Sequence, residues 1–175
     1  MPLTMYAITV PALLRGFGVM SYYLDTAEAY TTEKNISPAV LLDARLYPDM
    51  MSLTGQVQRM SDAAKSAVIR LTGVMNTPFA DTETSFDALR DRISKTAALI
   101  AAIDPKLFDG SEDRTTEVKF RTGQGVMRGD AYVLQILLPN FYFHLATAHD
   151  ILRHNSIAVG KVNYFGEIAF SETAT

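Results

Sequence analysis

The residues best suited to chemistry lie together in a long apolar stretch near the C-terminal end of the chain. Asn140 and His144 are four residues apart, so on a helix their side chains project from one face. An imidazole and an amide on one face can hydrogen-bond a ligand, and the imidazole can also act as a base or a metal ligand. Pro139 precedes them and leaves the carbonyl of Gln135 without its helical donor. We expect a site at this break.

The other two histidines do not complete a metal site with His144. His149 lies five residues further on, about 140° around a helix, and His154 lies about 15 Å along the helix axis. Zinc and nickel favour several imidazole or thiolate ligands, and the chain has no cysteine. We therefore expect no metal or other cofactor, with a divalent ion bound through His144 as the less favoured alternative.

A purely structural explanation of the same side chains is also open. Buried polar groups need hydrogen-bond partners, so His144 could bond Gln56 or Tyr142 while Asn140 satisfies the carbonyl freed by the proline. Gln56 lies nearer than Gln58 to the apolar stripe of the second long helix. If the group is functional instead, it forms a ligand pocket between the second and fourth helices, with candidate residues Gln56, Gln58, Asn140, Tyr142 and His144.

Apolar residues recur at three- and four-residue steps in four long stretches, and this periodicity predicts four helices. The long helices are expected at residues 5–30, 50–71, 86–103 and 130–155, and a short one at residues 38–45. Residues 115–128 alternate instead, with a glycine-rich turn at 122–125, which predicts a small β-hairpin before the last helix. The sequence thus predicts an all-α four-helix bundle in one domain, residues 1–175, with the bundle at about 3–155 and a packed tail at 156–170.

Several single residues carry local expectations within these helices. Asp49 and Asp130 are suitable N-caps for the second and fourth long helices, and Asn155 suits a left-handed C-terminal residue. Gly16 and Gly18 weaken the first helix by about 1 kcal/mol each relative to alanine. We expect close packing of a neighbouring element to explain both glycines.

Composition narrows the class of protein further. The chain has 175 residues and a net charge of −3 with no basic block, which argues against a nucleic-acid partner. The longest apolar runs are too short to span a membrane, and the N-terminus lacks the pattern of a signal peptide. We expect a soluble cytoplasmic protein with no membrane partner, and a homodimer that pairs through its long helices.

Three blocks of sequence resemble a known superfamily. They are LLDARLYPDM at residues 41–50 followed by QVQ at 56–58, FDGSED at 108–113, and LPNFYFH at 138–144 with ILRHN at 151–155. Over about residues 3–166 the chain resembles the DinB/YfiT-like superfamily of four-helix bundles, and more closely one of its families of unknown function. The resemblance implies the bundle and a pocket within it.

The superfamily resemblance also implies a metal site that this chain does not reproduce. Such proteins bind a metal through one histidine on the second helix and two, spaced i and i+4, on the fourth, and characterised members include thiol-dependent transferases and isomerases. Here only His144 keeps a ligand type. Asn140 takes the other position on the fourth helix, and the second helix offers Gln56 or Gln58.

Three functions remain open from the sequence. The first is a degenerate member that lacks the metal and binds a small molecule between the second and fourth helices. The second is a metal-dependent enzyme of thiol-transferase type, in which His144 is a ligand or a general base. The third is a structural or interaction protein whose polar core only fixes packing.

Overall fold

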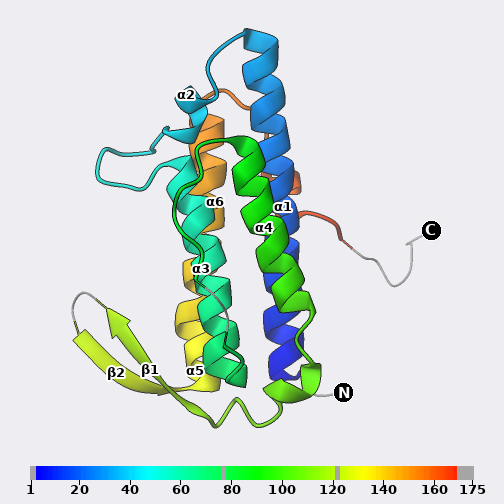
Figure 1. Cartoon of the computed structure of the whole chain (residues 1–175), viewed down its shortest axis with the longest axis vertical. Helices are drawn as coiled ribbons and strands as arrows, with labels where there is room; N and C mark the ends of the chain where they lie inside the picture. Colours follow the sequence, from blue (N-terminus) through cyan, green and yellow to red (C-terminus); the bar gives the residue numbers. More distant parts are fainter. Residues whose placement is uncertain (1–2, 76–77, 121–122, 169–175) are drawn as a thin grey trace.

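The computed structural model describes residues 3–75, 78–120 and 123–168. Its elements are α1 (Met5–Lys34), α2 (Ala39–Leu42), α3 (Leu53–Thr72), α4 (Phe86–Ala101), a 3-10 turn (Pro105–Phe108), β1 (Thr115–Phe120), β2 (Gly123–Arg128), α5 (Gly129–Tyr132), a π-helical turn (Val133–Leu137), α6 (Leu138–His154) and α7 (Lys161–Phe165). The predicted four-helix bundle, short extra helix and hairpin are confirmed (Figure 1). The fourth bundle helix is α5, the π turn and α6 in line.

The four bundle helices do not simply alternate in direction. Figure 1 shows α1 and α6 running one way and α3 and α4 running the other. Because α3 and α4 are parallel, the chain between them, residues 73–85, returns along the length of the bundle. A helix of 20 residues such as α3 is about 30 Å long, and thirteen extended residues can span that distance. Because this connection is extended, its own side chains must hold it against the bundle.

Three residues that the sequence predicted as helix caps do not take the predicted role or conformation in the structure. The N-cap of α3 is Ser52, whose hydroxyl accepts from the Gly55 amide, so Asp49 is not the cap. The fourth helix begins one residue before Asp130, and the Asp130 carboxylate accepts from the next backbone amide and from the neighbouring Arg128. Asn155 has a φ of −92°, and the left-handed residue is Ser156, at φ 68°.

The hairpin also begins its second strand earlier than predicted. Gly123 and Gly125 lie in β2, paired with Phe120 and Val118 of β1, so they are not turn residues. The remaining part of the predicted turn, residue 122, lies outside the described residues. The hairpin leans out from the foot of α3 and α5 in Figure 1 and places one face of β1 toward the bundle, where Val118 is buried.

Several residues of the tail, predicted as packed over residues 156–170, contact the bundle, among them the half-buried Tyr164. Ile157 and Val159 are buried against the bundle. Val162, Phe165 and Ile168 are exposed, and residues 169–170 lie outside the described range. None of the residues of α7 is fully buried.

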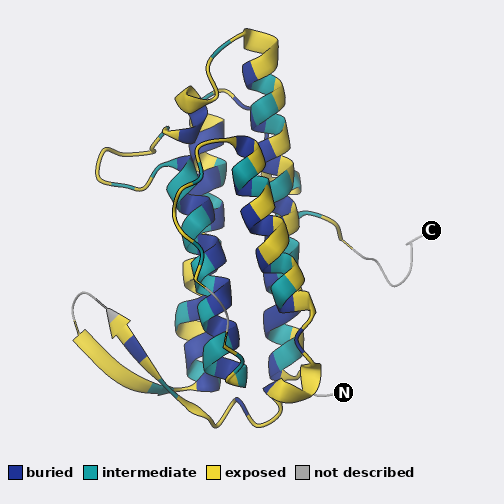
Figure 2. Cartoon of the chain, viewed as in Figure 1, coloured by how far each residue is buried: buried dark blue, intermediate teal, exposed yellow. Residues whose placement is uncertain are grey.

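One described helix, α1, is long and apolar enough to cross a membrane by length and hydropathy alone, contrary to the expectation from the sequence. Half of its most apolar window is buried against the other helices (Figure 2). The core helix of a bundle meets the same criteria because its apolar side chains pack against protein.

At two buried glycines an added Cβ would overlap a neighbour: at Gly129 the backbone carbonyl of Ser111, and at Gly16 a side chain of the core. Gly16 of α1 faces the ring of Phe141 of α6, and a Cβ at this position would overlap that ring. Phe141 is fully buried and meets Phe17 edge-to-face, with ring centroids 5.3 Å apart. Close packing therefore explains Gly16. It does not explain Gly18, because no atom lies within 4 Å of the position that a Cβ would take there.

The two glycines make a matched pair of substitutions. Gly16→Ala should lower the free energy of unfolding by about 1–2 kcal/mol, because overpacking against Phe141 outweighs the gain in helix propensity. Gly18→Ala should raise it by up to about 1 kcal/mol, since only the propensity changes. Urea denaturation of both variants tests this. Equal effects of the same sign would contradict the packing argument.

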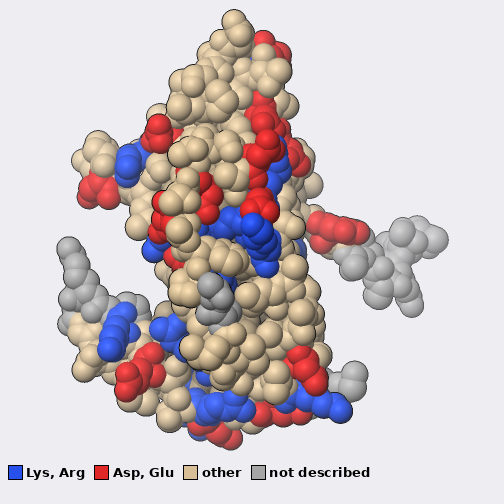
Figure 3. Space-filling model, viewed as in Figure 1, with Lys and Arg blue, Asp and Glu red and all other residues tan. Residues whose placement is uncertain are grey.

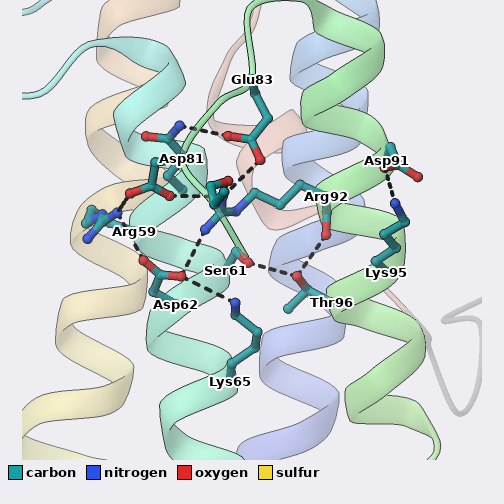
Figure 4. A network of polar contacts seen from close by, with 12 residues as sticks. Arg59, Ser61, Asp62, Lys65, Asp81, Glu83, Asp91, Arg92, Lys95 and Thr96 are labelled. Carbon is teal, nitrogen blue, oxygen red and sulfur yellow. Dashed lines mark hydrogen bonds and ion pairs between the residues drawn. The ribbon is translucent and has the colours of Figure 1, made fainter. Parts of the chain in front are cut away.

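A cluster of charges fixes the connection between α3 and α4 (Figure 4). At its centre Arg92 of α4, whose side chain is 2% exposed, pairs with Asp62, Asp81 and Glu83 at 2.9–3.0 Å. Arg59 joins the cluster through Asp62 and Asp81.

Further contacts support this cluster. The Arg92 guanidinium also donates to the Ala80 carbonyl. Lys65 lies over the ring of Phe79 and pairs with Asp62. The hydroxyls of Ser61 and Thr96 are hydrogen-bonded to each other beside the cluster.

Arg92 is the member whose loss should cost most. Arg92→Met should lower the free energy of unfolding by about 3–5 kcal/mol, because it leaves three carboxylates gathered around a site without its central cation. Lys95→Met is the control, since Lys95 forms an exposed ion pair with Asp91 on the same helix, and should change stability by less than about 0.5 kcal/mol. Thermal unfolding would show the difference, and similar losses in both variants would refute it.

Candidate functional site

A groove runs along one side of the bundle between α3 and α6 and is closed at one end by β1. Its volume is about 260 Å³. The groove is lined by Arg59, Asp62, Ala63, Ser66, Arg70, Val118, Lys119, Tyr132, Ile136, Leu137, Asn140 and His144. Figure 3 shows the hairpin standing away from the bundle on this side, with the surface hollowed between them. The position, between the second and fourth bundle helices, is the one the sequence indicated.

A π turn sets which residues of the fourth helix face the groove. The Leu138 amide bonds the Val133 carbonyl, five residues back, instead of the usual four. Pro139 follows at once and lies in the first turn of α6, where no amide donor is needed. The predicted break at Pro139 is therefore a widened turn that inserts one residue. The helix then continues with Asn140 and His144 on the groove side.

His144 is hydrogen-bonded to the buried side-chain amide of Gln56. Its Nδ1 lies 2.7 Å from Oε1 of Gln56, and Gln56 Nε2 donates to the Met51 carbonyl at 2.9 Å. Gln56 is 1% exposed, so both of its bonds are shielded from water. The Met51 carbonyl can only accept, which turns the amide nitrogen of Gln56 toward it and the amide oxygen toward His144.

This chain of bonds assigns the tautomer of His144. Because Gln56 presents an oxygen, Nδ1 of His144 must carry the proton and donate. The other ring nitrogen, Nε2, then holds an unprotonated lone pair. Burial lowers the pKa of His144 to about 4, and the positive charge of Arg59 acts on that pKa in the same direction. At neutral pH the groove therefore contains a neutral imidazole.

The remaining sequence candidates lie in three different places. Asn140 is exposed and lines the groove beside His144, so it does not satisfy the carbonyl freed by Pro139 from a buried position. Gln58 faces away, and its amide donates to Glu83 at 2.8 Å in the charge cluster. Tyr142 lies on the α1 side, where its hydroxyl accepts from Arg15 at 2.9 Å. The structure thus brings together Gln56, Asn140 and His144 and separates the other two.

The sequence reasoning missed the basic residues of the groove. Arg59, Ser66 and Arg70 lie at steps of seven and four on α3, a polar stripe that could have been noticed beside the apolar one. Lys119 could not have been found in this way, because its place depends on how the hairpin packs on the bundle.

The donors around His144 do not fit the metal site that the superfamily resemblance implies. The imidazole is hydrogen-bonded to the Gln56 amide, shares the groove with the Asn140 amide, and feels the charge of the Arg59 guanidinium. Amides are weak ligands for zinc or nickel. Among residues 3–75, 78–120 and 123–168, no group of three or more His, Cys, Asp or Glu side chains could hold a metal ion.

A larger cavity of about 580 Å³ lies between α1 and α7. Two of its polar side chains, Arg15 and Asn163, already donate hydrogen bonds to protein groups. Arg15 donates to the Phe165 carbonyl and to Tyr142, and Asn163 donates to the Tyr22 hydroxyl. The His144 groove is smaller, but it contains a histidine with a lowered pKa and several convergent polar groups, and these features are also typical of a binding site.

The depressed pKa of His144 makes stability depend on pH. Between pH 6.5 and about 4 the unfolded chain binds a proton that the folded chain refuses, so stability is complete above pH 6.5 and falls as pH drops through that window. The loss should be about 1–2 kcal/mol, since partial exposure and solvent screening reduce the full effect. Urea titrations of wild type and His144→Gln at several pH values isolate this part. An identical pH slope in both would refute it.

Comparisons with known proteins show to which family the chain belongs. The family model described as "Domain of unknown function (DUF1993)" matches residues 5–165. The crystal structure of a DinB family member protein from Shewanella denitrificans is similar over 97% of this chain and 96% of that chain, with a TM-score of 0.88 and 32% sequence identity. A comparison with curated proteins gives no match. The resemblance to the DinB-like superfamily is confirmed, and the chain belongs to the DUF1993 family, a DinB-like family of unknown function.

Proposed function

We propose that this protein binds a small molecule in the groove between α3, α6 and β1, and that His144 recognises the ligand as a neutral hydrogen-bond acceptor. The observation that carries the proposal is the orientation of the imidazole. Nδ1 is committed to the buried Gln56, which leaves Nε2 as the ring nitrogen that a ligand in the groove can reach. A ligand with a hydroxyl or N–H group supplies the matching donor.

The lining of the groove supports binding by shape as well as by this one bond. Ile136, Leu137 and Val118 provide apolar surface, and Asn140 and Ser66 provide further hydrogen-bond groups. Small-molecule sites commonly combine an apolar lining with a few oriented polar groups. The volume, about 260 Å³, suits a ligand of roughly the size of a single substituted ring.

The low basicity of His144 favours a role in binding over a role as a catalytic base. A general base works best with a pKa near the working pH, whereas burial holds the pKa of His144 at about 4. The thiol-transferase alternative also requires a metal, and the donor set does not fit one. A purely structural protein, the third alternative, would need no groove beside the imidazole. We further propose a cytoplasmic protein that acts as a homodimer, without a nucleic-acid or membrane partner.

Ligand-induced stabilisation tests the proposal. Uncharged phenols and amides at about 100 times their dissociation constant should stabilise the wild type by about 2.7 kcal/mol. The double variant Gln56→Leu/His144→Phe should lose this gain, because it removes the acceptor while replacing both partners of the buried bond with apolar groups. Differential scanning fluorimetry gives the measurement.

His154→Gln is the control, since it removes a histidine from the exposed end of α6 and should keep the full gain. Stabilisation of equal size in wild type and the double variant would show that ligands bind elsewhere. No stabilisation by any compound would favour the structural alternative.

A further inference from the structure

The charges of the groove are divided between its two ends. Arg59 and His144 lie at one end, and Arg70, Lys119 and Tyr132 lie at the other. Arg59 and Arg70 are eleven residues apart on α3, which separates the ends by about 16 Å along the helix axis. The groove is therefore elongated, and a ligand that fills it meets different chemistry at each end.

The cation at the His144 end is already neutralised. Arg59 pairs with Asp62 at 3.0 Å and with Asp81, both members of the charge cluster on α3 and the α3–α4 connection. An anionic ligand would have to compete with two carboxylates for this guanidinium. The His144 end thus favours an uncharged donor, as the proposed function requires.

The cations at the far end have no such partner. Arg70 donates through Nε to the Glu117 carbonyl at 3.4 Å, and its guanidinium lies 5.4 Å from the centre of the Tyr132 ring. These contacts hold the planar group in place without neutralising it. Lys119, on the exposed edge of β1, lines the same end. Within the described part of the chain, neither Arg70 nor Lys119 forms an ion pair with a carboxylate.

We propose that the groove selects ligands that carry an oxyanion, a carboxylate or a phosphonate-like group, at the end away from His144, where Arg70 and Lys119 bind it. This inference rests on the proposed function and adds the ligand class. A guanidinium can bind an oxyanion in a bidentate arrangement, and a nearby lysine adds a second charge. The ligand class is then a short molecule with a hydrogen-bond donor at one end, an apolar middle and an anion at the other.

Three matched probes test the anion. They are 4-hydroxyphenylacetate, 4-hydroxybenzylphosphonate and the uncharged 4-hydroxyphenylacetamide, which share the phenol donor and the ring. Millimolar titrations followed by NMR of the His144 imidazole report binding in the groove itself. At least one anion should bind about tenfold or more tightly than the amide, since hydrogen bonds to charged groups are the stronger ones. Its affinity should also fall as salt is added.

Substitutions of Arg70 and Lys119 test whether these two residues cause the preference for the anion. Arg70→Gln and Lys119→Gln should each reduce the preference for the anion and leave the affinity for the amide unchanged. Lys95→Gln is the matched control, because it removes the same charge from α4, outside the groove, and should keep the preference. Lys119 lies on an exposed strand, so its variant remains informative even if Arg70→Gln lowers stability.

The outcomes separate this inference from the proposed function. If the amide binds as tightly as both anions, the groove binds ligands without charge selection, and only the present inference is overturned. If the anions bind more tightly but Arg70→Gln and Lys119→Gln keep the full preference, the anion site is elsewhere and the inference is again overturned. If none of the three probes moves the His144 signals, the proposed function and this inference both fail.

Discussion

The groove depends on the orientation of a single buried amide, that of Gln56. Its nitrogen donates to the Met51 carbonyl in the turn before α3, and its oxygen accepts from His144 on α6. Rotating the amide by half a turn would place its oxygen against the Met51 carbonyl, leaving two acceptors in contact without water to separate them. One side chain therefore ties the turn, α3 and α6 together and also decides which ring nitrogen of His144 remains for a ligand.

The charge cluster shapes the same groove from the other side of α3. Asp62 pairs with Arg59, which lines the groove, and with Arg92, which holds the α3–α4 connection. Asp81 does the same from the connection itself. The parallel arrangement of α3 and α4 requires a long connection, the connection requires buried ion pairs, and those ion pairs neutralise one end of the groove. A topological feature thus determines where positive charge is left for a ligand.

Helix periodicity was sufficient for the bundle, because apolar stripes at three- and four-residue steps must face a common core. The same reasoning found Asn140 and His144, whose spacing alone puts them on one face. It failed where the partner comes from elsewhere in the fold. Tyr142 is drawn to Arg15 of α1 and Gln58 to Glu83 of the connection, and neither contact leaves a signal at short range in the sequence. The cap of α3 failed for a local reason, since the turn formed by the Met50 amide and the Tyr47 carbonyl delays the helix until Ser52.

The difference from the superfamily's metal site changes the charge that the site accepts. A site of three neutral histidines presents lone pairs and attracts a cation. In this chain one imidazole remains, and its Nδ1 proton is fixed by Gln56. Replacing imidazole ligands with amides removes the strong donors that a transition metal needs. The neutral lone pair of His144 favours a hydrogen-bond donor, and the other end of the groove favours an anion, because among the described residues Arg70 and Lys119 form no ion pair with a carboxylate. If the fold once held a metal in this groove, the chemistry of its present residues points to the opposite charge.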